Sequence, residues 1–589
     1  MDKNKVVMWI LLACLFYAYL LINGSNKKEK IVDKIETSQQ KSTDKDNSDL
    51  NDDLTINERN TNNNIFAKFT DGTESEYTLE NNLIKVIFSN KGGKIKEVVI
   101  KNEFDYKDNP VKIIDKQSTV INYEFCSEGN RIYSNDLYFS VNSTLSNKNA
   151  ICYEIQLSDS KKLRHIYTIQ NDSYCVEHTL QFTGANEYID NKKIVYHIHD
   201  KIKRQERDYE YCKNKTTINF LDTDGNFDSL DETLNTNQHK YCDKPLKWLA
   251  IRQRFFTLGI SDENSEFLKA SIDLNQSNDN EYLKEADIRF ELLRHNVTNV
   301  NDYVNNIKYY FGPNKYECLK NFNSSFEKNL YIGAPVMKQI NKYFIIPILD
   351  FLTNNVNNIV LVLLILSIFI RIILFPLFFK SYIGTEKMKI ISPMLLELNE
   401  KYKNDPQRAK IEQINLYRTM GVNPLSGCLP MFLQTPLLIA LFSIIPNYFN
   451  FRNQSFLWIE DMSSFDNIYT LSFSIPFYGN HVSLLAILMV ISTIGFMFMS
   501  RNDNLNQHNS SKYISYLFSF LFLFIMNSMP ASLNLYYLFS NIFTIAQRLI
   551  ISKFVDKQDL INNMNNNRNN VSTISFTEQI SKTMNKNKK

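Results

Sequence analysis

The sequence predicts a membrane protein with two different halves: an all-β domain outside the membrane and an α-helical bundle with six transmembrane spans. The 589 residues exceed one ordinary domain, and a mean hydropathy of −0.29 conceals the contrast between the halves. Residues 23–330 are polar and rich in Asn, Lys, Asp and Ser, whereas residues 356–552 contain five long apolar segments. Apolar runs of about 20 residues are long enough to cross a bilayer as helices.

The N-terminal segment predicts an uncleaved transmembrane anchor over residues 1–22. Its apolar run, Val6–Ile22, is 17 residues long, which exceeds the roughly 7–15 residues of a signal-peptide core. Leu-Leu-Ala-Cys14 resembles a lipoprotein cleavage box, so cleavage remains an alternative. Residues 23–64 are charged and rich in Asn, Ser and Thr. They predict a disordered tether, because they offer too little apolar surface to offset the entropy cost of ordering.

Residues 65–330 predict one large antiparallel β-sandwich. Apolar and polar residues alternate along short runs bounded by Asn, Asp and Gly, as strands require. The clearest runs are LIKVIFSN (83–90), KIKEVVIKN (94–102), HIYTIQ (165–170) and KIVYHIHD (193–200). His197 and His199 are two residues apart and so share one face of a strand. No further ligands follow at a recognisable spacing, so ordinary surface histidines are favoured over a metal site.

Cysteine spacing and net charge exclude several classes of protein. No CxxC motif occurs, which argues against zinc ribbons and thioredoxin-like redox sites. Disulfides and buried free thiols both remain open for the six cysteines of the polar half, and spacing does not determine a pairing. These are Cys126, Cys152, Cys175, Cys212, Cys242 and Cys318. A net charge of +3 argues against a dedicated nucleic-acid binder.

The C-terminal half predicts an interfacial helix followed by five spans. Met337, Ile340, Phe344 and Ile348 recur at helical spacing within residues 333–352. We expect this helix to lie along the membrane surface, with packing against the β domain as the alternative. Proline cannot continue a helix, so Met529-Pro530 predicts a tight reversal between the last two spans. The spans are 356–379, 425–446, 482–500, 513–529 and 532–552.

Lysine and arginine predict the orientation of these spans, since cytoplasmic loops carry more of them. Residues 380–424 and the tail 553–589 are rich in both, and the short loop 501–512 carries Arg501 and Lys512. The loop 447–481 has only Arg452 against three acidic residues. These charges place the first three segments in the cytoplasm and the β domain outside.

Residues 380–424 predict a cytoplasmic helical hairpin. Asp405 and Pro406 suit the N-cap and first position of its second helix. The first helix has an apolar stripe at heptad spacing, and the second has a matching face; these comprise Met388, Ile391, Leu395, Leu398 and Tyr402, then Ile411, Ile414 and Tyr417. Candidate residues for capturing partners are the basic ones, Lys387, Lys389, Lys401, Lys403, Arg408 and Lys410. The alternative is a solvated spacer, although long ordered loops tend to carry function.

Arg371 is the most informative residue, because it interrupts the apolar span 356–379. A buried arginine costs about 2.5–3.5 kcal/mol on insertion scales and usually faces water or a partner. Lys380 lies nine residues further on, so Arg371 lies about 13 Å deep, too far to reach the interface comfortably.

No Asp or Glu occurs in the predicted spans, so we interpret Arg371 as a single uncompensated cation. In a wet half-channel it would attract acidic or polar client segments and lower their desolvation cost. Four polar residues of neighbouring spans could line the same groove: Gln434, Ser540, Asn541 and Gln547. The alternative for each of them is an ordinary interhelical hydrogen bond.

Several segments resemble the YidC-type membrane protein insertase family. In the C-terminal half they are RIILFPL and GVNPLSGCLPMFLQTPL within 371–437, SFLWIEDMSS (455–464) and PASLNLYYLFSNIFTIAQ (530–547). In the polar half they are PLKWLAIRQRFFTLGI (245–260) and YYFGPNKYECLK (309–320). The resemblance covers essentially the whole chain. Ser426 departs from it where glycine is common, and Thr435 replaces a frequent methionine.

The resemblance implies a non-enzymatic insertase and chaperone of the bacterial inner membrane, without a cofactor or metal. It implies a periplasmic β-supersandwich, a cytoplasmic C-terminus, and a helical bundle around a polar groove that is open to the cytoplasm and the lipid. Arg371 corresponds to the groove arginine. The expected partners are nascent integral membrane proteins, the Sec translocon, the lipid bilayer and, through the hairpin, the ribosome and a targeting receptor.

Two alternatives stand beside the insertase: a secondary transporter and a structural scaffold of the secretion channel. Transporters usually show internal repeats and intramembrane acids, and this sequence has neither. A scaffold would not need Arg371. The client set, the Sec-dependent share of insertion, a ligand of the periplasmic domain and the oligomeric state remain open.

Overall fold

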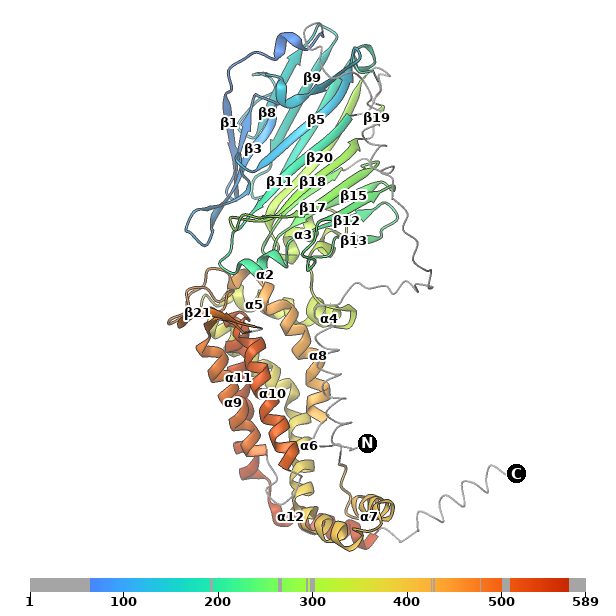
Figure 1. Cartoon of the computed structure of the whole chain (residues 1–589), viewed down its shortest axis with the longest axis vertical. Coiled ribbons are helices and arrows are strands. Elements are labelled where there is room, and N and C mark those ends of the chain that lie inside the picture. Colours follow the sequence, from blue (N-terminus) through green and yellow to red (C-terminus); the bar gives the residue numbers. More distant parts are fainter. Residues whose placement is uncertain are drawn as a thin grey trace, which may run out of the picture. The chain divides into compact units, whose positions relative to one another are not determined.

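A computed structural model describes the chain as two compact units, which divide between Tyr331 and Ile332 (Figure 1). We call them the β unit and the helical unit. The predicted anchor 1–22 and nearly all of the predicted tether 23–64 lie outside the described residues. The described residues are 64–190, 194–262, 267–292, 295–296, 302–424, 426, 429–476, 478–500 and 509–570.

The β unit contains three sheets whose described strands pair in antiparallel fashion. The largest, ten-stranded sheet follows the order β13-β12-β15-β16-β20-β10-β9-β8-β7, with β19 also paired to β20. Its strands are β7 (Ser140–Val141), β8 (Ala150–Gln156), β9 (Lys162–Ile169), β10 (Cys175–Thr183), β12 (Thr217–Asp222), β13 (Phe227–Ser229), β15 (Leu246–Arg252), β16 (Phe256–Asp262), β19 (His295–Asn296) and β20 (Tyr303–Pro313).

The other two sheets have six and four strands. The six-stranded sheet has the order β14-β17-β18-β11-β5-β6, and the four-stranded sheet runs from β1 to β4 in sequence. The six strands are β5 (Thr119–Ser127), β6 (Asn130–Tyr133), β11 (Ile194–Lys203), β14 (Gln238–Cys242), β17 (Ala270–Gln276) and β18 (Tyr282–Leu292). The four are β1 (Glu76–Glu80), β2 (Ile84–Ser89), β3 (Lys94–Phe104) and β4 (Pro110–Ile114).

The alternating runs of the sequence are confirmed as strands β2, β3, β9 and β11. His197 and His199 share a face of β11, as predicted, and both contact Asp287, at 3.1 and 3.3 Å. The six cysteines of this unit are free thiols. Burial raises the pKa of Cys152 to about 11, so its thiol stays protonated at neutral pH.

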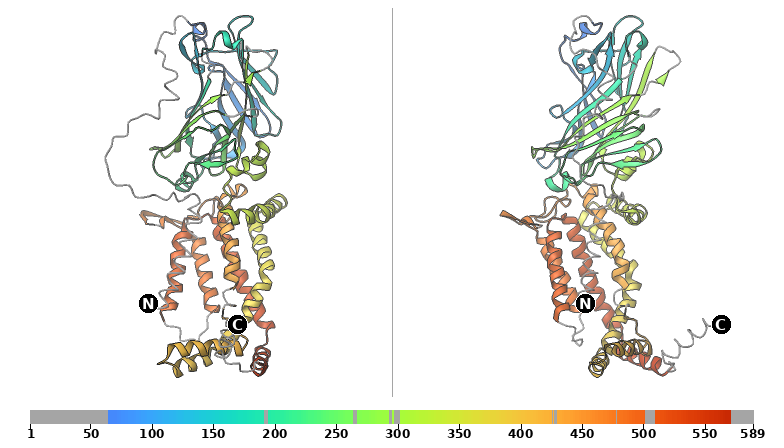
Figure 2. Two further views of the ribbon diagram at one scale, coloured as in Figure 1. Left: turned by 90° about the vertical axis from the view of Figure 1, so that its right-hand side faces the viewer. Right: turned by 45° about the vertical axis from the view of Figure 1, so that its right-hand side comes forward.

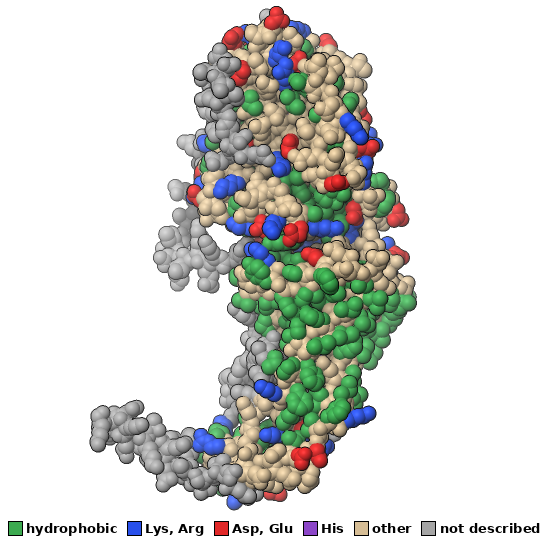
Figure 3. All heavy atoms as spheres, turned by 180° about the vertical axis from the view of Figure 1, so that it is seen from behind, with side chains coloured by type: hydrophobic (Ala, Val, Ile, Leu, Met, Phe, Trp, Pro, Cys, Tyr) green, Lys and Arg blue, Asp and Glu red, His purple; other side chains and the backbone are tan. Residues whose placement is uncertain are grey.

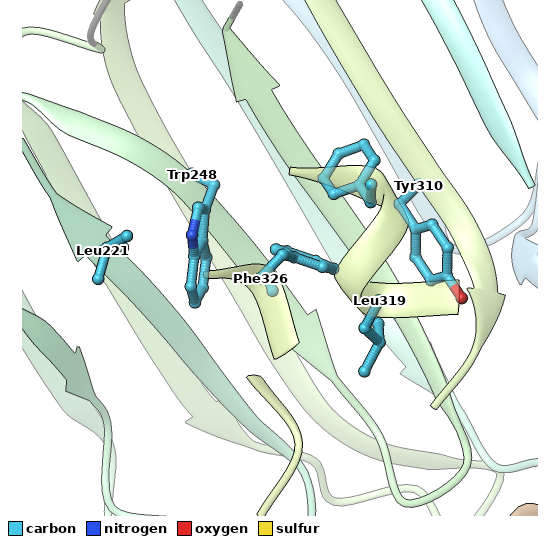
Figure 4. Packing of buried hydrophobic residues seen from close by; sticks show 7 residues of the cluster. Leu221, Trp248, Tyr310, Leu319 and Phe326 are labelled. Atoms are coloured by element: carbon cyan, nitrogen blue, oxygen red, sulfur yellow. The ribbon is translucent and has the colours of Figure 1, made fainter. Parts of the chain in front are cut away.

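A hydrophobic cluster packs two short helices onto the ten-stranded sheet (Figure 4). The helices are α3 (Tyr316–Phe322) and the 3₁₀ helix η6 (Phe326–Asn329). The Phe326 ring meets Trp248 edge-on with 4.9 Å between the centroids. Gly259 permits this approach, because a Cβ at that position would lie 2.5 Å from the Phe326 ring. Trp248 and Gly259 belong to the segment 245–260 that carries the family resemblance, so this segment builds a packing site.

A chain of hydrogen-bonded rings runs between the two large sheets. His165 and His178 of the ten-stranded sheet lie 3.1 Å apart through Nδ1 and Nε2. His178 Nδ1 lies 3.1 Å from the Tyr123 hydroxyl of the six-stranded sheet, which in turn lies 3.2 Å from the Tyr309 hydroxyl. Tyr309 donates to Tyr196 at 3.3 Å. Buried polar groups are costly unless they are paired. This series of hydrogen bonds therefore favours one packing arrangement of the two sheets.

The helical unit begins with a helical segment that covers most of the predicted interfacial helix 333–352. It consists of α4 (Pro335–Ile340), the π turn η7 (Asn341–Ile345) and α5 (Ile346–Asn355). Its buried residues are Met337, Asn341, Ile345, Ile346, Leu349 and Leu352, whereas Ile340, Phe344 and Ile348 of the predicted stripe are partly exposed. The π turn has i→i+5 hydrogen bonds, which shift the buried face relative to that of a regular α-helix. The predicted position along the membrane surface stays a prediction. The Asn341 side chain donates to the Ile332 and Ala440 carbonyls, at 2.9 and 3.0 Å.

One helix, α6 (Ile359–Lys401), is long and apolar enough to cross a membrane by itself among the described residues. A second candidate combines α11 (Ala531–Phe554) with α12 (Lys557–Asn570), which are bent by 71°. The shorter apolar helices are α8 (Leu429–Ile444), extended by η8 (Ile445–Asn447), and α9 (Leu484–Ser500). The six predicted spans therefore stay a prediction. Hydrophobic side chains gather over this unit on the face seen in Figure 3.

The remaining elements locate the turns and the loop between α8 and α9. A helix α10 (Asn509–Asn527) ends just before Pro530, which precedes α11 and confirms the predicted reversal. The loop between α8 and α9 carries the 3₁₀ turn η9 (Phe449–Phe451) and two strands, β21 (Tyr469–Ile475) and β22 (Gly479–Val482). The predicted tail 553–589 begins as helix, because α11 and α12 reach into it.

The predicted span 356–379 and the first helix of the predicted hairpin form one continuous helix, because α6 runs without a break to Lys401. The boundary between membrane and hairpin stays a prediction. The residues after Phe379 are more polar than those before it. Most of them are nevertheless good helix formers, so the helix continues. A second helix, α7 (Pro406–Thr419), packs on α6. Asp405 accepts a hydrogen bond from the Arg408 amide at 3.0 Å, which confirms the predicted N-cap.

The apolar face predicted for the second hairpin helix is wrong in part. Ile411 and Ile414 are exposed. The buried cluster instead unites Ile391 and Leu395 of α6 with Met420 and Val422, which follow α7, and with Met564 of α12. Since α12 supplies part of this cover, the hairpin sequence alone did not contain all the residues that decide which face is buried.

The ring chain generates a prediction about acid stability. Burial lowers the pKa of His165 to about 3 and that of His178 well below its usual value. Below about pH 6.5 the unfolded state binds protons on these histidines, whereas the native state does not. The histidines' contribution to the free energy of unfolding is therefore complete above about pH 6.5 and is lost as the pH falls. We expect His165→Gln to reduce the slope of unfolding free energy against pH by about 1.4 kcal/mol per pH unit. Urea denaturation followed by the fluorescence of Trp248, in a background with Trp9 and Trp458 replaced by Phe, measures it.

Tyr167→Phe is the matched control for this experiment. Tyr167 stacks on His178 and donates to the Gly93 carbonyl at 2.9 Å. Its replacement lowers stability without removing a histidine, so the slope should stay as in the unmodified protein. An unchanged slope in His165→Gln would show that the histidines take up protons in the folded state.

Candidate functional site

Arg371 lies on α6 with its side chain directed toward α11. The residue is only 5 % exposed. Its guanidinium donates through Nη2 to the Ser540 hydroxyl and lies 4.9 Å from the centre of the Phe378 ring. The other terminal nitrogen, Nη1, is buried and has no hydrogen-bond partner within the part of the chain that the structure describes. A buried charged donor without a partner is costly, so this nitrogen is available to an added polar group.

Two of the predicted groove residues meet Arg371. Ser540 accepts its hydrogen bond, and Gln547 Nε2 donates to the Arg371 carbonyl oxygen at 3.3 Å. Ser540 and Gln547 are seven residues apart, about two turns, so both lie on the face of α11 that meets α6. The structure thus assembles Arg371, Ser540 and Gln547 into one polar contact between two helices; we call it the arginine site.

The other two predicted residues lie elsewhere. Asn541 faces α9, where its side chain donates to the Ser492 and Thr493 hydroxyls at 2.9 and 2.8 Å. It therefore makes the interhelical hydrogen bonds that were its alternative role. Gln434 is partly exposed on α8 and makes no hydrogen bond to Arg371 among the described residues.

A second arginine within the predicted span 532–552 was missed, so the interpretation of Arg371 as a single intramembrane cation is wrong. Arg548 directly follows Gln547 on α11, and its guanidinium lies 5.6 Å from the centre of the Tyr382 ring. Glu386, which is 6 % exposed, attracts it electrostatically. Glu386 also accepts from Lys389 at 2.7 Å. The missed signal was an acid and an arginine on helices that pack together.

The six basic residues predicted for partner capture divide into two groups. Lys387 and Lys389 are partly buried on α6, and Lys389 pairs with Glu386. The other four are exposed around the turn between α6 and α7: Lys401, Lys403, Arg408 and Lys410. Lys401 and Arg408 both lie over the Tyr402 ring, at 5.6 and 5.5 Å from its centre. We call these four side chains the basic turn; the exposed acidic residues Glu397, Glu400 and Asp405 lie beside them in the sequence.

Two family models together match most of the chain. The model described as "60Kd inner membrane protein" matches residues 351–558, and the one described as "YidC periplasmic domain" matches residues 76–346. The arginine site and the basic turn fall within the first match. The ring chain and the Trp248 cluster fall within the second.

Curated relatives match over nearly the whole length. A protein named membrane protein insertase YidC from Amoebophilus asiaticus is 40 % identical over 570 residues, which cover 95 % of this chain and 94 % of the relative. Proteins of the same name from Azobacteroides pseudotrichonymphae and Parabacteroides distasonis are 31 % and 29 % identical, each covering 96 % of this chain and 95 % of the relative. A solved galactose mutarotase-like protein from Lactobacillus casei aligns to 40 % of this chain and 100 % of its own, with 8 % identity and a TM-score of 0.27.

Proposed function

Because this chain belongs to the YidC membrane protein insertase family, we propose that it inserts nascent integral membrane proteins into the bacterial inner membrane and helps them to fold. The family is not an enzyme family. It consists of inner-membrane proteins with a periplasmic domain, which corresponds here to the β unit. The observation that carries the proposal is the arginine site, because a buried cation with an unused donor suits transient binding of a polar segment.

The proposed mechanism begins with the exported tail of a client entering a polar groove next to Arg371. A carboxylate or backbone carbonyl of the tail accepts a hydrogen bond from Nη1, the nitrogen without a partner among the described residues. A hydrogen bond to a charged group contributes about 1.5–3 kcal/mol, so this contact favours binding of the tail. The client's apolar helix then moves into lipid, because burying roughly 20 apolar residues favours insertion.

Ser540 and Gln547 position the arginine in this proposal. Ser540 holds one edge of the guanidinium, and Gln547 ties α11 to the backbone of α6. We keep Gln434 as a more distant groove residue on α8, while Asn541 stabilises the contact between α9 and α11. The polar groove itself remains part of the proposal.

We expect Arg371→Lys to retain much of the insertion activity and Arg371→Ala to lose more of it. Lysine keeps the charge but loses the planar geometry of guanidinium. The loss should be greatest for clients with acidic exported tails, by about tenfold if roughly 1.4 kcal/mol of attraction disappears. The measurement is insertion of paired clients that differ only in tail acidity, at equal levels of each variant.

Ser540→Ala is the matched control, because it removes the partner of Arg371 and keeps the charge. It should preserve the preference for acidic tails. If Arg371→Ala inserted both clients as well as the unmodified protein does, Arg371 would have a purely structural role.

We further propose six transmembrane spans, with the residue 380–424 hairpin and the C-terminus in the cytoplasm and the β unit in the periplasm. The distribution of Lys and Arg supports this orientation. A membrane-impermeant maleimide applied to intact spheroplasts should add one label to Glu460→Cys above the background of the native cysteines. Asn404→Cys should gain a label only after permeabilisation. Labelling of Asn404→Cys in intact spheroplasts would reverse the orientation.

The basic turn supports a proposed role in capturing the ribosome, a targeting receptor or clients delivered by the Sec translocon. We expect a variant with Lys401, Lys403, Arg408 and Lys410 replaced by Gln to bind ribosomes several-fold more weakly in co-sedimentation at low salt, because exposed charges attract polyanions. The control replaces the exposed Glu397 and Glu400 of the same hairpin by Gln. Unchanged binding and insertion by the four-residue variant would make the hairpin a spacer.

A further inference from the structure

The outer loop between α8 and α9 contains a two-stranded ribbon, β21 paired with β22, which the sequence analysis did not predict. An isolated two-stranded hairpin is only marginally stable in water. Figures 1 and 2 show that this ribbon projects sideways from the ends of α9 and α10 within the helical unit. Its described residues form no part of a larger sheet. No further described strand therefore pairs with the ribbon.

Exposed apolar side chains are concentrated on the ribbon and its surrounding loop. Tyr469 and Thr470 begin β21 opposite Val482 and His481, and the pairing of the strands is irregular between Thr470 and Ile475. Tyr469 and Phe473 are 66 % and 62 % exposed. The neighbouring Leu457 and Trp458 add exposed apolar surface to the same loop.

The base of the ribbon is fixed to the outer ends of two helices. Asn527, the last residue of α10, donates to the Tyr478 and His481 carbonyls at 2.9 and 2.8 Å and accepts from the Ser483 amide at 2.9 Å. Asp466, just before the ribbon, accepts from the Leu485 amide of α9 at 3.0 Å. The ribbon is therefore held at the level where these two apolar helices end.

Residues 467–482 contain no Lys, Arg, Asp or Glu. A surface that binds a charged partner would carry complementary charge, whereas the membrane interface favours Tyr, Trp and other amphipathic side chains. We propose that β21–β22 lies in the outer interface of the bilayer, with the exposed Tyr469 and Phe473 directed into the boundary between headgroups and acyl chains. The occupant of this exposed apolar surface is phospholipid.

This placement gives the ribbon a mechanical role. A membrane-bound ribbon that is hydrogen-bonded to both α9 and α10 resists tilting and vertical movement of that helix pair. It would keep the helix pair at a fixed depth in the bilayer. The inference needs α9 and α10 to lie in the membrane and is independent of whether Arg371 binds clients.

Photo-crosslinking in the full-length protein tests the proposal. The photoreactive residue p-benzoylphenylalanine replaces the apolar Phe473 or its polar neighbour Ser472, with Tyr469 and Thr470 as a second matched pair, because neighbouring residues of a strand point to opposite sides. All four native side chains are exposed, so the substitutions leave the core intact. Each variant is irradiated in vesicles of phosphatidylethanolamine and phosphatidylglycerol and in native membranes, and adducts are identified by mass spectrometry.

We expect phospholipid adducts at positions 469 and 473 to exceed those at 470 and 472 by at least several-fold in both settings. Three results would overturn the proposal: equal lipid adducts on both faces, no lipid adduct on either face, or a predominant adduct at position 473 with a second copy of the chain or with another protein. Insertion assays on the same samples test the insertase mechanism separately. Lipid contact by the ribbon does not require client binding, so either proposal can fail without the other.

Discussion

The constraint that polar groups require partners when water is excluded shapes the helical unit. Arg371 is placed among apolar residues and, among the described residues, its side chain donates one hydrogen bond, to Ser540. The helices α6 and α11 must therefore stay close enough for that bond and for the contact from Gln547 to the α6 backbone. A buried arginine without any partner would strongly disfavour burial.

Several buried polar groups elsewhere in the molecule are well paired. In the β unit, His165, His178, Tyr123, Tyr309 and Tyr196 form one continuous chain of hydrogen bonds between sheets. In the helical unit, Asn527 uses both its donor and its acceptor beside the ribbon. Asn541 likewise binds two hydroxyls of α9. These paired groups stabilise the fold. Arg371 Nη1 is one of several buried polar atoms without a partner among the described residues, and it differs from most of them in carrying a charge.

Exposed surfaces divide between two chemistries. The turn between α6 and α7 presents four basic side chains and suits polyanionic partners, which charge attracts over distance. The outer ribbon has no formal charge over residues 467–482 and suits lipid. If the proposed orientation holds, the protein would meet its cytoplasmic partners through electrostatic attraction and stabilise its outer side through apolar contact with the membrane. The two functions would then be separable by mutation.

The sequence by itself determined the class of the protein, the strands β2, β3, β9 and β11, the cap at Asp405 and the reversal at Pro530. The strands, the cap and the reversal depend on local rules: period-two alternation, capping chemistry and proline geometry. Tertiary structure decided the rest. The π turn shifted the buried face of 335–355, and α12 packed on the hairpin. Asn541 bonded to α9, whereas Ser540 and Gln547 bonded to α6. A residue's neighbours across helices depend on helix rotation and packing, which one-dimensional spacing does not encode.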